Sequence, residues 1–539
     1  MNQTSSAYER RSAPPATKTQ NGQDVLRDLR ANEVFIAIVG PAGSGAGTAA
    51  SILKSFLEEH DFQTEIVKAS TLIRSAAEAA GYDVPLLDAR KSLDGVHQMQ
   101  DRGDELRKGE QYGRDEDHSA VARLILRGIS ESRARLQGIE YSGGPVEPDG
   151  TPRAFIIDSL RHPAEVALLR QVYQDAFSLI GIVCDPSKRE QRIRENFFDR
   201  AQWGNEITKS RVKSFLTRDE NAPDKHGQHV SDTFHEADFF VDNSEDAEDD
   251  LAITGMNSQL RRFVNLVTQR KIVRPTTAET AMHHARSAQM RSACLSRQVG
   301  AALVDASGNI VATGTNDVPR AGGGLYGEGF SLEIKGDQRC AFRETVYCSS
   351  NREQNYIIDE LISAFPELTS KTEKQDIIKI IRETRLGGLI EFSRAVHAEM
   401  DAILSASISG VSPRGCRMYV TTYPCHYCAR HIVASGIDEV QFIEPYPKSK
   451  ATELHSDSIT TDSENWSPPS GGGSHVLFRP FVGVAPQLYR KVFIKDRSYK
   501  NKITGELEFG EPSWGGPTES YKVSYSSMEA SLCLESNDG

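Results

Sequence analysis

The sequence contains no apolar run approaching the roughly 18 residues that a membrane-spanning helix needs. Its first thirty residues lack the apolar core of a signal peptide, so we expect a cytoplasmic protein without membrane contact. Cysteine is scarce, with eight in 539 residues, and these are expected to be reduced thiols. Positive charge is also in deficit, with 63 Lys and Arg against 75 Asp and Glu and a formal net charge of −12. This acidic balance, with 7% aromatic residues, argues against stable binding of nucleic acid.

The length predicts two to four domains at roughly 100–200 residues each. Strand-like runs alternate with helix-like segments in the first half, which predicts a mostly parallel α/β sheet covered on both faces. The four runs are VFIAIVG, AFIIDS, FSLIGIVCD and ADFFVDN. We expect a mobile leader at 1–30, a P-loop kinase-like nucleotide-binding domain at 31–250, a linker at 251–276, a catalytic domain at 277–500 with an insertion at 320–396, and a tail at 501–539.

A glycine-rich loop follows the first predicted strand and opens a helix, the context that a phosphate-binding loop requires. The candidate nucleotide contacts are Gly40, Gly43, Ser44, Gly45, Gly47 and Thr48. The match to a P-loop fails at the lysine, because that position is Ala46. Since phosphoryl transfer depends on such positive charge, we expect nucleotide binding without kinase activity.

Charged residues further along the first domain fit the same interpretation. Asp158 ends its predicted strand, where an acid associated with magnesium would lie. Arg192, Arg194 and Arg218 belong either to a lid over a nucleotide or to charged helix surface.

Two short motifs in the second half carry the chemistry: His397-Ala398-Glu399 and Pro424-Cys425-His426-Tyr427-Cys428. One histidine and two thiolates make a zinc set with the fourth tetrahedral position free for water. A structural zinc site would normally be closed by a fourth protein ligand, so this set predicts catalysis. Together the motifs form the signature of a zinc deaminase.

Glu399 is the expected acid–base catalyst. Zinc lowers the pKa of a bound water to about 7, and Glu399 can reach that water without being a ligand. It can then move the proton to a substrate nitrogen. His397 and Cys425 are expected at helix N-termini, where the partial positive charge favours thiolates and hydroxide.

The segments around these motifs resemble deoxycytidylate deaminases. They are SRQVGAALV (296–304), TGTNDVP (313–319), HAEMDAIL (397–404) and TTYPCHYCARHIVASGI (421–437). The resemblance implies a cytidine deaminase-like α/β/α sandwich, bound Zn²⁺, free deoxycytidine nucleotides as substrate and a homo-oligomer. It also implies that Arg297 lies near the phosphate, that Asn316 contacts the sugar, and that Ala398 and Tyr446 border the pocket.

The sequence departs from this family at three places. Asp401 stands where the family usually has asparagine. The insertion at 320–396 is longer than a compact deaminase needs, so substrate entry or regulation is expected to differ. Cys294 and Cys340 stand where some relatives have ligands of a second, structural zinc, or they are buried thiols.

A degenerate kinase-like domain before a deaminase domain resembles the two-domain bacterial anti-phage deoxycytidylate deaminases. That resemblance implies conversion of dCTP and dCMP to dUTP and dUMP, which depletes a nucleotide needed by phage, under restraint from the first domain and the insertion. Two alternatives remain open: a deaminase of tRNA or single-stranded DNA, and a non-catalytic nucleotide-sensing regulator.

Overall fold

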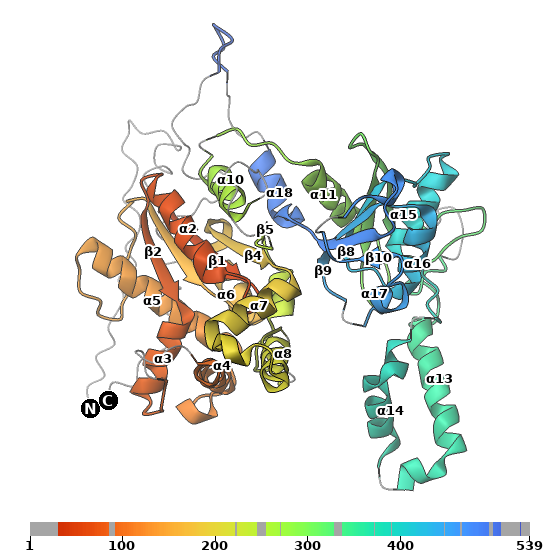
Figure 1. Cartoon of the computed structure of the whole chain (residues 1–539), viewed down its shortest axis with the longest axis horizontal. Helices are drawn as coiled ribbons and strands as arrows, with labels where there is room; N and C mark the ends of the chain where they lie inside the picture. The colour runs from red at the N-terminus through yellow and green to blue at the C-terminus, as the bar shows by residue number, and fades with distance from the viewer. Residues whose placement is uncertain are drawn as a thin grey trace. The chain divides into compact units, whose positions relative to one another are not determined.

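The computed structural model describes residues 31–85, 92–220, 222, 224–244, 255–269, 271–327, 337–370, 372–389, 391–446, 448–463, 466–494, 500–507 and 529. The chain forms two compact units, one of residues 1–274 and 490–539 and the other of residues 275–489 (Figure 1). The expected leader lies outside the described residues, as do most of the expected tail and part of the linker. Within the described part of the chain, no helix combines the length and the apolar composition that crossing a membrane requires.

The first unit is built on a parallel sheet with the strand order β5-β4-β1-β3-β2. Its strands are β1 (Glu33–Val39), β2 (Gln63–Lys68), β3 (Arg153–Asp158), β4 (Phe177–Val183) and β5 (Phe239–Asp242). Every residue of β1 and β4 is buried, as expected for strands covered on both faces. The four strands predicted from apolar runs are therefore confirmed.

Helices cover both faces of this sheet. They are α2 (Ala46–Glu58), α3 (Ala69–Ala79), α4 (Leu93–Lys108), α5 (Ala120–Gln137), α6 (Pro163–Tyr173), α7 (Pro186–Phe197), α8 (Glu206–Glu220), α9 (Val230–Phe234) and α10 (Met256–Thr268). Helix α2 packs with α10, and α5 packs with α6. The connection from β1 to β2 crosses the sheet towards one edge, and the connection from β3 to β4 crosses it towards the other edge. Because both crossovers are right-handed, α2 and α6 lie on opposite faces.

A residue near the end of the sequence is buried in the first unit. Glu529 is fully buried, and its carboxylate lies 2.6 Å from Nη1 of Arg133. The hydroxyl of Tyr173 donates to the same carboxylate at 2.6 Å. Arg133 also pairs with Glu33 of β1 at 2.9 Å. The buried guanidinium is thus neutralised by acids from both ends of the sequence.

We expect Glu529→Ala to lower the free energy of unfolding of the first unit by about 3 kcal/mol, because it leaves part of a buried charge uncompensated. Urea denaturation followed by tryptophan fluorescence would measure the change. Glu506→Ala, which removes an exposed acid, is the matched control and should have little effect. Equal unfolding midpoints for the two variants would show that the ion pair of Arg133 and Glu529 does not stabilise the first unit.

The second unit is an α/β/α sandwich. Its sheet has the order β10-β11-β9-β8-β6-β7, in which β6 is antiparallel to β7 and β8 and the remaining pairs are parallel. The strands are β6 (Gly300–Val304), β7 (Ile310–Thr315), β8 (Arg417–Thr422), β9 (Glu439–Glu444), β10 (Ile459–Thr460) and β11 (Val476–Pro480). The predicted fold class, a parallel α/β sheet followed by an α/β/α sandwich, is confirmed.

The principal helices of this unit are α11 (Thr277–Gln289), α13 (Ser349–Ala364), α14 (Lys374–Glu383), α15 (Ala398–Ile408), α16 (His426–Ser435) and α17 (Ala451–Leu454). Helices α13 and α14, both from the expected insertion, lie side by side (Figure 1). Helices α11 and α15 pack on the β6–β7 hairpin, and α16 packs beside α15.

Two glycines allow these helices to approach the hairpin closely. A Cβ at Gly300 would lie 1.9 Å from the carbonyl oxygen of Ala285 in α11. A Cβ at Gly314 would lie 2.1 Å from the carbonyl oxygen of Ala398 in α15. Gly314 pairs with Ala301, the neighbour of Gly300, so the two glycines face opposite sides of the sheet. Helices α11 and α15 therefore cover opposite faces of the sheet.

We expect Gly314→Ala to displace α15 and to lower thermal stability, since the added methyl group meets backbone atoms that cannot rotate away. Overpacking of this kind typically costs about 1–3 kcal/mol. The melting temperature should fall. Gly327→Ala, where a Cβ has open space, is the control, and equal melting temperatures would contradict the prediction.

Candidate functional site

The two chemical motifs meet at the N-termini of neighbouring helices. His397 is the N-cap of α15, and Cys425 is the N-cap of α16, where its sulfur accepts a hydrogen bond from the Cys428 amide. The predicted helix starts at both motifs are confirmed. Pro424 follows the carboxyl end of β8, so the site lies where ligands commonly bind in α/β sheets.

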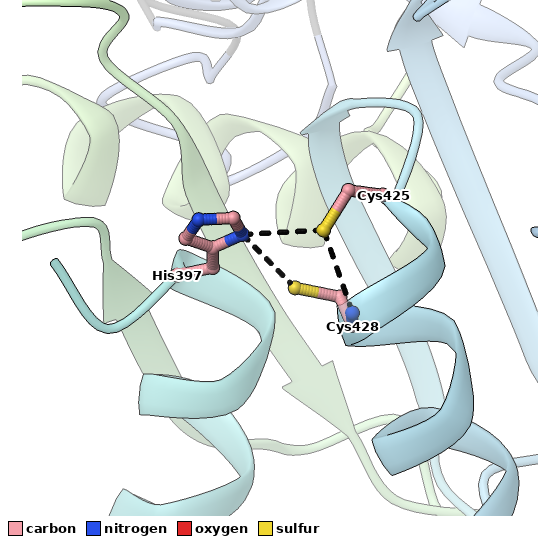
Figure 2. A group of neighbouring side chains, drawn as sticks. All are labelled: His397, Cys425 and Cys428. Carbon is pink, nitrogen blue, oxygen red and sulfur yellow. Dashed lines mark hydrogen bonds between the residues drawn. The ribbon is translucent and has the colours of Figure 1, made fainter. Parts of the chain in front are cut away.

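Three side chains form a compact ligand set (Figure 2). Nδ1 of His397 lies 3.3 Å from Sγ of Cys425 and 3.3 Å from Sγ of Cys428. A tetrahedral zinc with ordinary bond lengths separates nitrogen and sulfur ligands by roughly 3.5 Å. The spacing and the chemistry of the donors therefore fit zinc, and the three ligands leave a fourth position for a non-protein ligand.

Burial and mutual contacts shift the pKa values of the three ligand side chains in different directions. Hydrogen bonds from Cys428 and His397 lower the pKa of Cys425 to about 4 despite its burial. Burial raises the pKa of Cys428 well above its ordinary value. Burial also opposes a charge on His397, but the hydrogen bond with Cys425 leaves the pKa of His397 raised. A thiol as buried as Cys428 becomes a thiolate when a metal ion coordinates it.

Glu399 lies in the same pocket and is 3% exposed. Burial, reinforced by the negative charge of Cys425, raises its pKa to about 7. A carboxyl group with this pKa can both accept and return a proton at neutral pH. Asp401, two residues later, instead accepts a hydrogen bond from the Thr315 amide at 3.0 Å and so supports β7.

His397, Glu399 and Cys425 line a cavity of 410 Å³, a size suited to a single small ligand. Asn316 lies in its wall, where its amide donates to the Arg297 carbonyl and accepts from the Val299 amide. One amide N–H and one lone pair of Asn316 remain for a ligand. Ala398 is fully buried at the start of α15.

Arg297 and Tyr446 lie together in this wall. The Arg297 guanidinium is 6.0 Å from the centre of the Tyr446 ring, and Nη1 is 3.5 Å from the carboxylate of Glu444. The Arg297 side chain is 51% exposed. It can therefore contact both solvent and a ligand in the cavity.

Two basic residues in the cavity wall were not predicted from the sequence. Arg394 and Lys448 line the cavity beside Arg297. Arg394 comes from the expected insertion, three residues before His397, and Lys448 lies two residues beyond Tyr446. A search for basic residues flanking the motifs would have found both.

Three further cysteines line the cavity: Cys294, Cys340 and Cys348. Among the described residues, none of them joins a group of three metal ligands. The structure therefore gives no support to a second zinc at Cys294 and Cys340.

The predicted nucleotide loop of the first unit forms a tight turn before α2. Gly43 and Gly45 have φ values of 80° and 94°, which favour glycine. The Ala42 amide donates to Asp219 at 2.6 Å, so a carboxylate already occupies one of the loop's N–H groups. The remaining predicted contacts, Gly40, Ser44, Gly47 and Thr48, lie in the turn and the first turn of α2.

The basic residues expected near that loop have different neighbours. Arg192 donates to the Gly43 carbonyl at 3.4 Å. Arg218 pairs with Asp101 and Asp104 of α4. Asp158 lies at the end of β3, and a Cβ at Gly47 would be 3.7 Å from its carboxylate.

Comparison with known proteins identifies the class to which the second unit belongs. The model of the cytidine and deoxycytidylate deaminase zinc-binding region matches residues 275–444. Deoxycytidylate deaminase of Enterobacteria phage T2 is 30% identical over 178 residues, which cover 32% of this chain and 82% of that protein. Deoxycytidylate deaminase of Enterobacteria phage T4 is 31% identical over 178 residues, which cover 32% of this chain and 80% of that protein.

A solved structure, dCMP deaminase from the cyanophage S-TIM5, has a TM-score of 0.21 and 17% identity, and the match covers 39% of this chain and 99% of that one. The two phage enzymes decide the assignment: the chain belongs to the deoxycytidylate deaminase family.

Proposed function

We propose that this protein is a zinc-dependent hydrolase that deaminates free deoxycytidine nucleotides, dCMP, dCTP or both, to the uracil products. The observation that carries the proposal is the ligand set of His397, Cys425 and Cys428, with Glu399 in the same cavity wall as His397 and Cys425. Membership of the deoxycytidylate deaminase family supports deamination of dCMP.

His397, Cys425 and Cys428 would hold the metal, which supplies hydroxide at neutral pH from a bound water. Glu399 takes a proton on its carboxylate and delivers it to N3 of the cytosine ring. The oxygen of the attacking water bonds to C4 in the same step. Glu399 then carries the second proton of that oxygen to the amine, the C4–N bond breaks, and ammonia departs. Arg297, Arg394 and Lys448 provide positive charge in the cavity wall for the substrate phosphate.

A panel of substrates tests this proposal against the two alternatives. The full chain is incubated with dCMP, dCTP, single-stranded DNA and tRNA, and the products are read by mass spectrometry. Uracil nucleotides from dCMP or dCTP support the proposal. Product from the polynucleotides alone would overturn it, and no product from any substrate would favour the non-catalytic regulator.

We expect Arg297→Gln to raise KM for the nucleotide by about 10–100-fold with a smaller effect on kcat, since a hydrogen bond to a charged group contributes roughly 1.5–3 kcal/mol. Steady-state kinetics with dCMP and with deoxycytidine would measure it, because the nucleoside lacks the phosphate and should be unaffected. Arg430→Gln, an exposed change on α16, is the control. An unchanged KM for dCMP would show that Arg297 does not contact the phosphate.

We also propose that the activity serves anti-phage defence, by depletion of dCTP, and that the first unit restrains it by binding a nucleotide at Gly40–Thr48. The resemblance to two-domain defence deaminases supports this. Nucleotide pools are measured in infected and uninfected cells that express the protein or its Glu399→Ala variant. A loss of dCTP on infection, confined to the active protein, is expected, and equal pools would contradict the role.

A further inference from the structure

A second group of metal-ligand side chains lies in the first unit, outside the deaminase site. It consists of Glu116, His118 and His226, whose ligand atoms all lie within 4.8 Å of one another. Glu116 and His118 come from the loop that precedes α5. His226 comes from the loop between α8 and α9.

The ligand atoms of this group lie close together. Oε1 of Glu116 is 2.9 Å from Nε2 of His118 and 3.2 Å from Nε2 of His226. A tetrahedral zinc with nitrogen and oxygen ligands separates them by roughly 3.3 Å, given bonds of about 2.0–2.2 Å. The two carboxylate-to-imidazole distances thus suit ligands of one ion, and the two imidazole nitrogens lie within 4.8 Å of each other.

A carboxylate orients His226 by contacting Nδ1, the ring nitrogen that faces away from Glu116. Nδ1 of His226 lies 2.9 Å from Oδ1 of Asp224, which is itself held by Lys108 at 2.6 Å. This contact places the ring proton on Nδ1 and leaves the lone pair of Nε2 directed toward Glu116. Metal-binding histidines usually have such a carboxylate partner on the nitrogen that faces away from the metal.

Nε2 of His226 contacts Glu116 but forms no well-aligned hydrogen bond with any described residue. His226 is 9% exposed, and among the described residues its buried Nε2 has no hydrogen bond of ordinary geometry. Lys225 neutralises Glu116 through contacts of 2.7 and 2.9 Å. That ion pair satisfies the exposed carboxylate, but it leaves the buried Nε2 unexplained. A metal ion bound between them would use both the Glu116 carboxylate and Nε2 of His226 as ligands.

A neighbouring histidine fixes the second imidazole ligand. The His118 ring stacks on His162 at 5.1 Å and on His226 at 5.0 Å. Both nitrogens of His162 are in use, since Nδ1 accepts from the Ala164 amide and Nε2 contacts the Lys225 carbonyl. His162 therefore packs against the group without joining it as a ligand.

We propose that Glu116, His118 and His226 bind a divalent transition-metal ion, with Zn²⁺ the best match to two imidazoles and a carboxylate. The ion joins the loop before α5 to the loop after α8. That second loop continues from Asp219, which holds the Ala42 amide of the glycine loop. Metal binding here therefore stabilises the segment that carries Asp219, and through Asp219 the proposed nucleotide loop.

Cobalt titration of the full chain, first stripped of metal by a chelator, separates the two sites. Co²⁺ at His397, Cys425 and Cys428 gives a thiolate-to-cobalt charge-transfer band, whereas the proposed site has no sulfur ligand and gives visible bands alone. In the His397→Ala chain we expect one equivalent of Co²⁺ to bind with visible bands and without the charge-transfer band. Zinc content after gel filtration should likewise retain one equivalent.

Adding His226→Gln to that chain should remove this equivalent, and Asp224→Asn should weaken its affinity by about 10–100-fold, as loss of an orienting carboxylate does. His235→Gln, a change of the same kind in the same unit, is the control and should leave binding intact. Glu116→Gln, at an exposed side chain, replaces His226→Gln if that variant does not fold. The proposal is overturned if the His397→Ala chain binds neither Co²⁺ nor Zn²⁺, or if the ligand variants bind as the control does.

Discussion

Glu399→Gln is expected to lower kcat for dCMP by about 10³-fold, within the range that general acid–base catalysis contributes. Glutamine keeps the shape of the side chain but cannot carry the proton from the attacking water to the ring nitrogen. KM and zinc content should change little, because Glu399 is not among the metal ligands. Steady-state kinetics and elemental analysis on the same preparation would measure all three.

Asp401→Asn is the matched control for that variant. Asp401 lies on the same helix, is buried and is an acid, but it accepts a hydrogen bond from the Thr315 amide. Asparagine can accept the same bond, so activity should be retained. If Glu399→Gln kept more than about a tenth of the activity, the assigned proton-transfer role would be wrong.

His397→Ala should abolish both the catalytic metal and the activity. Removing one of three ligands leaves two cysteine sulfurs, and the pKa of Cys428 already lies well above its ordinary value because of burial. We expect kcat/KM to fall by at least about 10³-fold, since the metal provides several kcal/mol of transition-state stabilisation. Zinc should fall by one equivalent per chain, measured by plasma mass spectrometry.

His431→Ala controls for the general effect of losing a histidine near the site. His431 lies on α16, three residues beyond Cys428, where its Nδ1 contacts the Tyr427 carbonyl. Its zinc content should match that of the unmodified chain. Retention of full zinc by His397→Ala would mean that another residue binds the metal.

The sequence was most informative where one short segment carries both structure and chemistry. Apolar runs predict the buried strands, because a strand covered on both faces needs no polar residue. The spacing of His397 and Glu399 on one helix start, and of Cys425 and Cys428 on another, is local. The constraint that joins the two segments is the tetrahedral geometry expected of the proposed zinc, so their meeting could be anticipated.

Contacts between distant segments could not be anticipated in this way. The contacts of Glu444 with Arg297 and of Asp219 with the Ala42 amide depend on how segments far apart in the chain are brought together. The group of Glu116, His118 and His226 spans more than a hundred residues and has no fixed spacing. Such groups arise from topology, and a linear motif search does not detect them.

The burial of Glu529 has a consequence for the order in which the protein matures on the ribosome. The second unit is one continuous segment, 275–489, and every residue it needs has been translated before Glu529 leaves the exit tunnel. The first unit begins earlier, but Arg133 lacks one of its acidic partners until then. The deaminase unit can therefore reach its native state during synthesis, while the glycine-loop unit is finished last.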